Sequence, residues 1–229
     1  MGVAALILAA GSGSRMKMNT TKQKIVLNGQ SVLLRTVSVF DSSDIVDSIT
    51  VVVRSEEVDF AKQELSGIGK LHKIVVGGDT RLKSVKNGIL HIPDISQYVA
   101  IHDAARCLIT HGMIKLVYED AVKYGAATAS TSVTDTIKQI GIDGNILNTV
   151  DRSQLVSVQT PQIFKLDKYI KALSLVDDDD KTITDDNMVF ERAGFSVHPT
   201  ETGKNNIKIT VPEDLKYAEF LLNGGSDHV

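Results

Sequence analysis

The amino-acid sequence predicts a single α/β domain, residues 1–229, in which a mostly parallel β-sheet carries helices on both faces and an inserted β-hairpin forms an arm. Short apolar segments alternate with segments of helical periodicity from the N-terminus to Ala126. There the alternation stops, and two β-prone segments flank an Asp-Gly pair. Strands that alternate with helices are typical of βαβ units, whereas Asp-Gly between β-prone segments is typical of a hairpin.

Length, composition and charge limit the kind of protein. The 229 residues, of which 42% are hydrophobic, are enough to bury a core without disulfides. A net charge of −3 gives no globally basic surface, so we expect no nucleic-acid partner. Cys107 is the single cysteine, which excludes an internal disulfide and suits a reducing compartment. Because we see no signal peptide and no apolar segment of roughly 20 residues, we expect a cytoplasmic protein without membrane attachment.

Up to Ala126 we expect four strands and four helices in alternation. Runs of Val, Ile and Ala predict strands at residues 3–7, 49–53, 73–76 and 98–101. Apolar residues at helical spacing predict helices at residues 32–40, 56–65, 81–90 and about 111–124. We assign these apolar stripes to the core and give them no functional role.

The arm is expected at about residues 132–155. Residues 129–138 and 145–150 are β-prone, and Asp143-Gly144 lies between them. An inserted hairpin in an α/β domain is expected to pack on another surface, such as a second subunit. The alternative is a local hairpin that stays on the same sheet.

The remaining sequence returns to the α/β pattern. It predicts helices near residues 168–175 and 186–193, a strand at residues 206–210, and a helix that begins at Pro212. The acidic run Asp177–Asp180 has no histidine nearby, so we expect a solvated loop rather than a metal site.

The most informative segment follows the first strand and reads LAAGSGSRMKMNTTK from Leu8 to Lys22. Its small residues let backbone N–H groups approach phosphate oxygens. Arg15 supplies a forked donor and Lys22 a point charge. The segment therefore predicts a polyphosphate site, and the alternative is a plain glycine-rich turn.

A second segment, His102 to Arg106, follows the fourth strand, where open α/β sheets bind ligands. Asp103 would repel a polyphosphate unless a divalent cation such as Mg²⁺ lay between them. The alternative is that Asp103 caps the next turn. For His102 we expect a structural role.

A third segment, Gly77 to Val85, follows the third strand. Its glycines permit close approach to a flat base, and Asp79 and Ser84 offer hydrogen bonds to the edge of that base. The alternative is helix capping by Asp79 or Thr80.

Polar residues after Ala126 each have a structural and a functional interpretation. They are Thr136 and Arg152 on or beside the arm, Thr160, Thr184 and Lys208. Lys208 interrupts an apolar alternation, and it either reaches solvent or projects a charge into a site.

Together these segments resemble a known family. In order they read LAAGSGSRM…TKQK, GGDTRLKSVKNG, HDAAR, DTIK, DR…QTPQIF, TDD and NNIKIT. From about residue 3 to residue 222 the chain resembles the 2-C-methyl-D-erythritol 4-phosphate cytidylyltransferase family. The resemblance implies a Rossmann-like fold and a homodimer in which the β-arm crosses to the partner. It also implies transfer of CMP from CTP to 2-C-methyl-D-erythritol 4-phosphate, with release of diphosphate, on the non-mevalonate route to isoprenoid precursors.

The resemblance also implies residue roles. The residues that would hold CTP are Ala9, Ala10, Gly11, Gly13, Gly78, Asp79 and Ser84. Those that would hold the polyol phosphate are Asp103, Arg106, Thr136, Thr160 and Thr184. The catalytic charges would be Arg15, Lys22, Arg152 and Lys208. Asp103 would also bind Mg²⁺, and Thr136 and Arg152 would act from the neighbouring subunit's arm.

The alternatives differ in substrate or in chemistry. The nearest is the same transfer to ribitol 5-phosphate, but LAAG and HDAAR favour methylerythritol phosphate, since the ribitol group more often shows LAGG and HDAVR. The retained Arg15, Lys22, Asp103 and Lys208 argue against a non-catalytic nucleotide-binding homologue. A dehydrogenase is disfavoured because the loop lacks the third glycine of the dinucleotide fingerprint.

Three positions depart from the family pattern. Thr21 and Cys107 stand where the family usually has Pro, and Val156 stands where it usually has Trp. None of them removes a charge that the reaction needs, but they leave loop rigidity and polyol specificity open.

Overall fold

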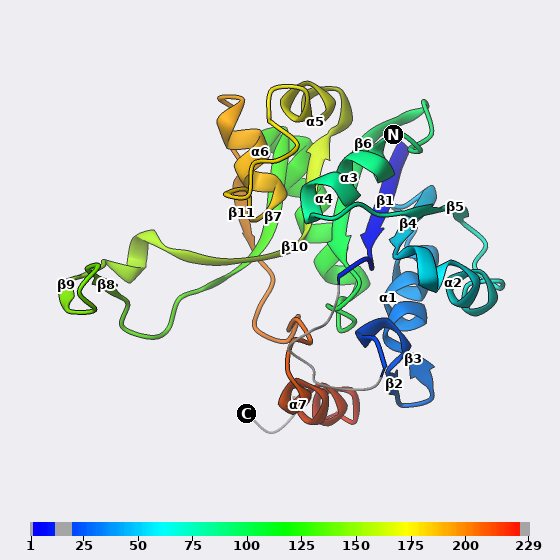
Figure 1. The fold of residues 1–229 in the computed structure, drawn as a ribbon, viewed down its shortest axis with the longest axis horizontal. Helices are drawn as coiled ribbons and strands as arrows, with labels where there is room; N and C mark the ends of the chain where they lie inside the picture. The colour runs from blue at the N-terminus through cyan, green and yellow to red at the C-terminus, as the bar shows by residue number, and fades with distance from the viewer. Residues whose placement is uncertain (1, 12–19, 225–229) are drawn as a thin grey trace.

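The computed structural model describes residues 2–11 and 20–224, and its centre is a seven-stranded sheet in the order β11-β7-β10-β6-β1-β4-β5 (Figure 1). The strands are β1 (Gly2–Leu8), β4 (Ser48–Val53), β5 (Leu71–Val76), β6 (Ser96–Asp103), β7 (Ala126–Ser132), β10 (Val156–Lys165) and β11 (His198–Glu201). Only β10 runs antiparallel to its neighbours in this sheet. The mostly parallel sheet is therefore confirmed.

Helices cover both faces of the sheet. They are α1 (Val32–Asp41), α2 (Val58–Glu64), α3 (Arg81–Ile89), α4 (His111–Tyr124), α5 (Leu166–Leu173) and α6 (Asp186–Arg192). A further helix, α7 (Pro212–Leu222), lies apart from these two faces. Short 3-10 turns are η2 (Lys22–Lys24), η3 (Ser55–Glu57) and η4 (Arg152–Gln154). None of the helices within residues 2–11 and 20–224 has the length and apolarity needed to cross a lipid bilayer.

The core forms because central strands are apolar on both sides. In β1, Ala5 and Ile7 pack in a cluster with α1, α2 and α4, whereas Ala4 and Leu6 pack in a second cluster with α3, α5 and α6. Strands that are buried on both faces have continuous apolar sequences, and the central strands of this sheet have such sequences.

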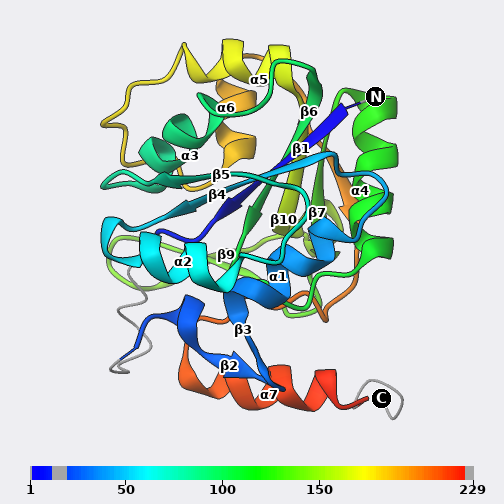
Figure 2. The same cartoon turned by 90° about the vertical axis from the view of Figure 1, so that its right-hand side faces the viewer.

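A smaller apolar cluster lies at one end of the molecule, where the short strands β2 (Val26–Leu27) and β3 (Gln30–Ser31) lie beside α7 (Figures 1 and 2). Cys107 is buried in this cluster, and burial raises the pKa of its thiol to about 11. At this position the Cys therefore acts as a small apolar residue.

The arm is a two-stranded hairpin, β8 (Lys138–Ile140) and β9 (Ile146–Thr149), that projects away from the sheet (Figure 1). Gly144 in its turn has φ +80°, a left-handed conformation that glycine adopts without strain. The predicted inserted hairpin is confirmed. The expected strand at residues 129–138 divides into β7, which belongs to the central sheet, and β8.

Two other expectations need correction. The strand predicted at residues 206–210 is wrong, because this segment is irregular and its backbone bonds to a loop and to side chains instead of a strand. Ile209 N donates to Ala105 O, and Asn206 O accepts from the Arg106 guanidinium. Only a short strand is expected before Gln159, because Pro161 signals a break, but β10 continues through Pro161 to Lys165. A register irregularity at residues 158–162 accommodates it between β6 and β7.

Candidate active site

A cavity of about 570 Å³ opens at the carboxyl ends of β1, β4, β5 and β6. Its lining includes eight residues that the sequence singles out: Ala10, Gly11, Lys22, Gly78, Asp79, Ser84, Asp103 and Lys208. A second cavity of about 270 Å³ adjoins it and is lined by the predicted residues Arg106, Thr160 and Thr184. Arg81, Asp103 and Lys208 line both cavities. The strand-end placement that the sequence predicts is thus what brings most of the candidate residues together.

Asp103 lies between two cations at the junction of the cavities. Lys208 Nζ is 2.6 Å from Asp103 Oδ2, and Arg81 Nε is 3.6 Å from Asp103 Oδ1. Burial acts to raise the pKa of Asp103, but attraction to Arg81 and Lys208 outweighs it and holds that pKa well below its usual range. Asp103 is therefore a carboxylate near neutral pH, and Lys208 projects its charge into the site.

His102 holds this region in place and is fully buried. Its Nε2 lies 3.2 Å from Arg106 O, and its Nδ1 lies 3.1 Å from Thr160 Oγ1. Burial lowers the pKa of His102 to about 4, so the ring is neutral and donates through Nε2, because a carbonyl oxygen only accepts. Thr160 in turn accepts from Asp103 N at 3.0 Å. The structural role expected for His102 is confirmed, and it positions the Asp103 backbone.

The loop that follows β5 is shaped by close packing. A Cβ at Gly77 would lie 2.7 Å from a side chain of the first loop, and one at Gly78 would overlap the α3 segment, so both positions require glycine. Thr80 caps α3, which leaves the Asp79 side chain at the cavity. Ser84 Oγ accepts from Gly78 N at 3.1 Å and donates to Thr80 O at 2.9 Å, so it holds the loop as well as lining the cavity.

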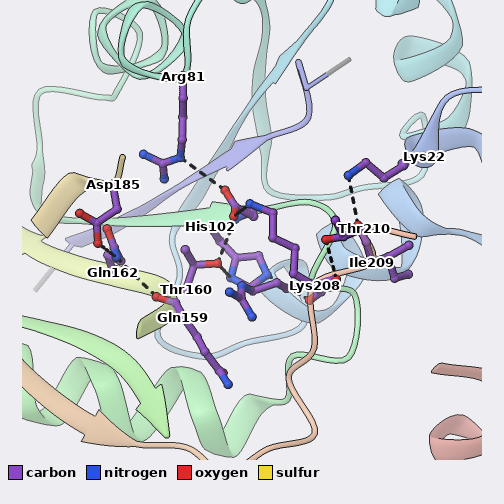
Figure 3. A network of polar contacts seen from close by, with 12 residues as sticks. Lys22, Arg81, His102, Gln159, Thr160, Gln162, Asp185, Lys208, Ile209 and Thr210 are labelled. Carbon is purple, nitrogen blue, oxygen red and sulfur yellow. Dashed lines mark hydrogen bonds and ion pairs between the residues drawn. The ribbon is translucent and has the colours of Figure 1, made fainter. Parts of the chain in front are cut away.

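Lys22 is 9% exposed, and its Nζ donates to Ile209 O at 3.1 Å (Figure 3). The preceding residue, Thr21, has φ −78° and ψ 153°, values that a proline also adopts. Its hydroxyl donates to a carboxylate oxygen of Glu57, which is 1% exposed. The departure at Thr21 therefore keeps a proline-like backbone and adds a side-chain anchor.

Ala9 lies behind the larger cavity rather than in its lining. It is 1% exposed, its N–H donates to Val52 O at 2.7 Å, and its carbonyl oxygen accepts from the Gln23 amide. Ala10 and Gly11 line the cavity itself. In this structure Ala9 positions the loop that these two residues form.

Besides Ala9, four predicted residues are not placed at the cavities. Gly13 and Arg15 lie outside the described residues. Within the described part of the chain, Thr136 and Arg152 line neither cavity, and both are exposed on the arm. Arg152 donates to the carbonyl of Thr134 on the same arm.

Sequence reasoning assigned no role to Arg81, which lines both cavities. Its ion pair with Asp186 joins residues that are 105 positions apart, which no local pattern reveals. The one available signal is its place as the first residue of α3, after the Gly-Gly turn.

The residues at the junction of the two cavities fit a divalent cation whose other ligands are mainly the phosphate groups of bound substrates. Residues 2–11 and 20–224 contain no cluster of three His, Cys, Asp or Glu side chains able to hold a metal ion on its own. Mg²⁺ needs only one or two carboxylates when phosphates and water supply the other ligands. Asp103 offers Oδ1, whose ion-pair contact with Arg81 is a loose 3.6 Å.

Comparison with known proteins gives consistent results. A family model described as 2-C-methyl-D-erythritol 4-phosphate cytidylyltransferase matches residues 3–224. A relative of that name from Clostridium acetobutylicum is 40% identical over 225 residues, which are 97% of this chain and 98% of the relative. A solved structure of 4-diphosphocytidyl-2C-methyl-D-erythritol synthase from Anaerococcus prevotii is 28% identical, with a TM-score of 0.87 and coverage of 97% of this chain and 96% of the other. The cytidylyltransferase structure from Thermus thermophilus has a TM-score of 0.79 and 26% identity, covering 97% and 100%.

Proposed function

Because this chain belongs to the 2-C-methyl-D-erythritol 4-phosphate cytidylyltransferase family, we propose that it transfers CMP from CTP to 2-C-methyl-D-erythritol 4-phosphate and releases diphosphate. The observation that carries the proposal is the pair of adjoining cavities with Arg81, Asp103 and Lys208 at their junction. One cavity suits a nucleotide and the other a small polyol phosphate. We treat residues 1–229 as one nucleotidyltransferase domain.

The reaction forms one P–O bond and breaks another. A phosphate oxygen of the polyol phosphate attacks the α-phosphorus of CTP, and the bond from that phosphorus to the diphosphate oxygen breaks. The attacking phosphate is already anionic at neutral pH, so no side chain has to remove a proton. Catalysis then consists of aligning two anions and neutralising the charge that develops on the leaving diphosphate.

The larger cavity would hold CTP. Ala10, Gly11, Gly78, Asp79 and Ser84 line it, and Ala9 supports the first loop from behind. Lys22, together with Arg15, would stabilise the triphosphate as charge moves to the leaving group. The contacts of Lys22 with Ile209 and of Thr21 with Glu57 support this role, because they hold the lysine at the cavity.

The smaller cavity would hold the polyol phosphate. Asp103, Arg106, Thr160, Thr184 and Lys208 line it. Lys208 would orient the attacking phosphate, and Asp103 would bind the polyol. When a divalent cation is bound, it neutralises phosphate charge, and Asp103 would be its protein ligand.

We further propose that the arm completes this cavity from a second copy of the chain in a homodimer. Thr136 and Arg152 would then supply the remaining contacts to the polyol phosphate. The arm carries exposed apolar side chains that a partner would cover: Ile140, Ile142, Ile146 and Leu147, at 61–111% exposure. A cytoplasmic location is consistent with the single buried Cys107.

The direct test is to incubate the protein with CTP and Mg²⁺ plus either 2-C-methyl-D-erythritol 4-phosphate or ribitol 5-phosphate, and to measure diphosphate. We expect release that depends on the methylerythritol compound. A preference for ribitol 5-phosphate would overturn the substrate and keep the chemistry. Absence of release with both, together with CTP binding, would identify a non-catalytic homologue.

A further inference from the structure

Arg81 occupies a place in the site that the proposed roles leave unexplained. Its side chain lines both cavities and makes two ionic contacts, with Asp103 on one side and Asp186 on the other. The contact with Asp186 is the tighter one, at 2.6 Å from Nη2 to Oδ2. Figure 3 shows the other contact, from Arg81 to the carboxylate beside Lys208.

Asp186 is a buried anchor whose two carboxylate oxygens both accept hydrogen bonds. It is 1% exposed, and its Oδ1 accepts from the Tyr169 hydroxyl at 2.6 Å. Tyr169 is fully buried and stacks on Phe164 with ring centroids 4.7 Å apart. The Asp186 N–H donates to Gln162 Oε1 at 3.0 Å. Because two hydrogen-bond donors hold this buried carboxylate residue in place, its ion pair fixes the position of the Arg81 guanidinium.

The Arg81–Asp186 pair also joins the walls of the two cavities. Arg81 is the first residue of α3, directly after the loop whose Gly78 and Asp79 line the larger cavity. Asp186 is the first residue of α6, two positions after Thr184 in the smaller cavity. The pair therefore sets how the nucleotide wall and the polyol wall lie relative to Asp103.

We propose that Arg81 is a positioning residue, which Asp186 and Tyr169 anchor and which fixes the Asp103 carboxylate where the two substrates meet. The proposal rests on the proposed function, since it concerns the alignment of CTP with the polyol phosphate. Its consequence is that Arg81 acts through Asp103, and that its loss affects the transfer step more than the binding of CTP alone.

The test uses the intact chain and three measurements on Arg81→Met. These are steady-state diphosphate release, CTP affinity without polyol phosphate, and thermal unfolding. We expect kcat/KM for the polyol phosphate to fall about a hundredfold, the loss typical of a small misplacement of reacting groups. CTP affinity should stay within about twofold. Because Arg81→Met leaves Asp186 unpaired, Arg81→Met with Asp186→Asn provides a variant without a buried lone charge, and it should show the same loss.

A double-mutant cycle with Asp103→Asn separates positioning from a general structural role. If Arg81 acts through Asp103, adding Arg81→Met to Asp103→Asn lowers kcat/KM by less than about threefold. The matched control is Lys83→Met, which removes a nearby charge on α3 whose partner, Asp179, is on the surface. It should keep wild-type kinetics.

Several outcomes would overturn the inference. They are wild-type kinetics in Arg81→Met, full additivity with Asp103→Asn, or a loss of CTP affinity as large as the loss of kcat/KM. The last outcome would make Arg81 a nucleotide-binding residue. In each case the wild-type protein still releases diphosphate and the proposed function stands. A wild-type protein that releases no diphosphate contradicts the proposed function and this inference with it.

Discussion

The two arginines Arg81 and Arg152 show how differently the two parts of the candidate site are built. Arg81 lines both cavities and is held by a carboxylate that is 1% exposed. Arg152 is exposed on the arm and bonds to the carbonyl of Thr134. A charge that is paired with a buried carboxylate is positioned by its own chain, whereas a partner would have to position an exposed charge on an arm. The described residues of the nucleotide half are thus already brought together within one chain, whereas in our proposal the arm half requires a second chain.

The largest effect should come from the nucleotide half. Lys22→Met removes the charge that we propose stabilises the leaving diphosphate, so kcat should fall about a hundredfold, equivalent to roughly 3 kcal/mol of transition-state stabilisation. Arg15→Met should act similarly. Steady-state kinetics and thermal unfolding check this together, and the fold should be intact. The control is Lys24→Met, since Lys24 is exposed and lies over the Phe60 ring. Near wild-type turnover in Lys22→Met would exclude the assigned role.

The arm should affect the second substrate only. If Arg152 contacts the polyol phosphate as we propose, Arg152→Met removes that charged contact, and kcat/KM for the polyol phosphate should fall about thirtyfold, equivalent to about 2 kcal/mol. CTP affinity, measured by calorimetry, should not change. Lys138→Met provides the control, because Lys138 is exposed on the same arm and bonds locally to Thr149. Weakened CTP binding in Arg152→Met would contradict the division of the site into two halves.

The anchor at Thr21 should have a smaller effect. Thr21→Val keeps the shape of the side chain but removes its bond to the buried Glu57, so Lys22 is held less firmly. We expect kcat/KM for CTP to fall about fivefold, equivalent to about 1 kcal/mol. Thr21→Ser retains a hydroxyl and should restore most of the activity. Equal kinetics for Thr21→Val and the wild type would show that the backbone alone positions Lys22.

The nucleotide half should also respond to pH through His102, with an effect on stability rather than on turnover. Its pKa in the folded chain is about 4, below the unfolded value of about 6.5, so the unfolded state binds the proton first as pH falls. Stability that is present above pH 6.5 should be lost toward pH 4. Between pH 7 and pH 5 the loss is about 2 kcal/mol. Urea unfolding of wild type and His102→Asn at both pH values checks this, and an equal loss in the two proteins would contradict it.

Local patterns were sufficient for the parts of the fold that depend on local residues. The sequence patterns of β1 and α4 predict the right elements. A strand that is buried on both faces has a continuous apolar run, whereas a helix that is buried on one face has apolar residues at helical spacing. The short strand β11 was missed because its pairing with β7 is set by residues far away in the chain. The apolar alternation of residues 206–210 predicts a strand, but the backbone atoms Asn206 O and Ile209 N bond to a loop and not to a neighbouring strand.

The candidate site shows the same difference between features that local sequence predicts and features that depend on distant contacts. Lys22, Asp79 and Asp103 could be selected from the sequence because they follow strands whose carboxyl ends meet at one edge. Their individual roles required the family resemblance. The ion pair of Arg81 with Asp186 could not be predicted, because this contact depends on how α3 and α6 pack on the same face of the sheet.

Mixing the Lys22→Met and Arg152→Met variants tests the sharing of the site most directly. In a dimer that holds one chain of each kind, one site has an intact nucleotide half and receives an intact arm, while the other site has neither. If the arm acts in the partner's site, co-expression at equal levels should restore about a quarter of wild-type diphosphate release, since half of randomly assembled dimers are mixed and each has one intact site. Activity no greater than the average of the two variants measured separately would show that the arm serves its own chain or no site.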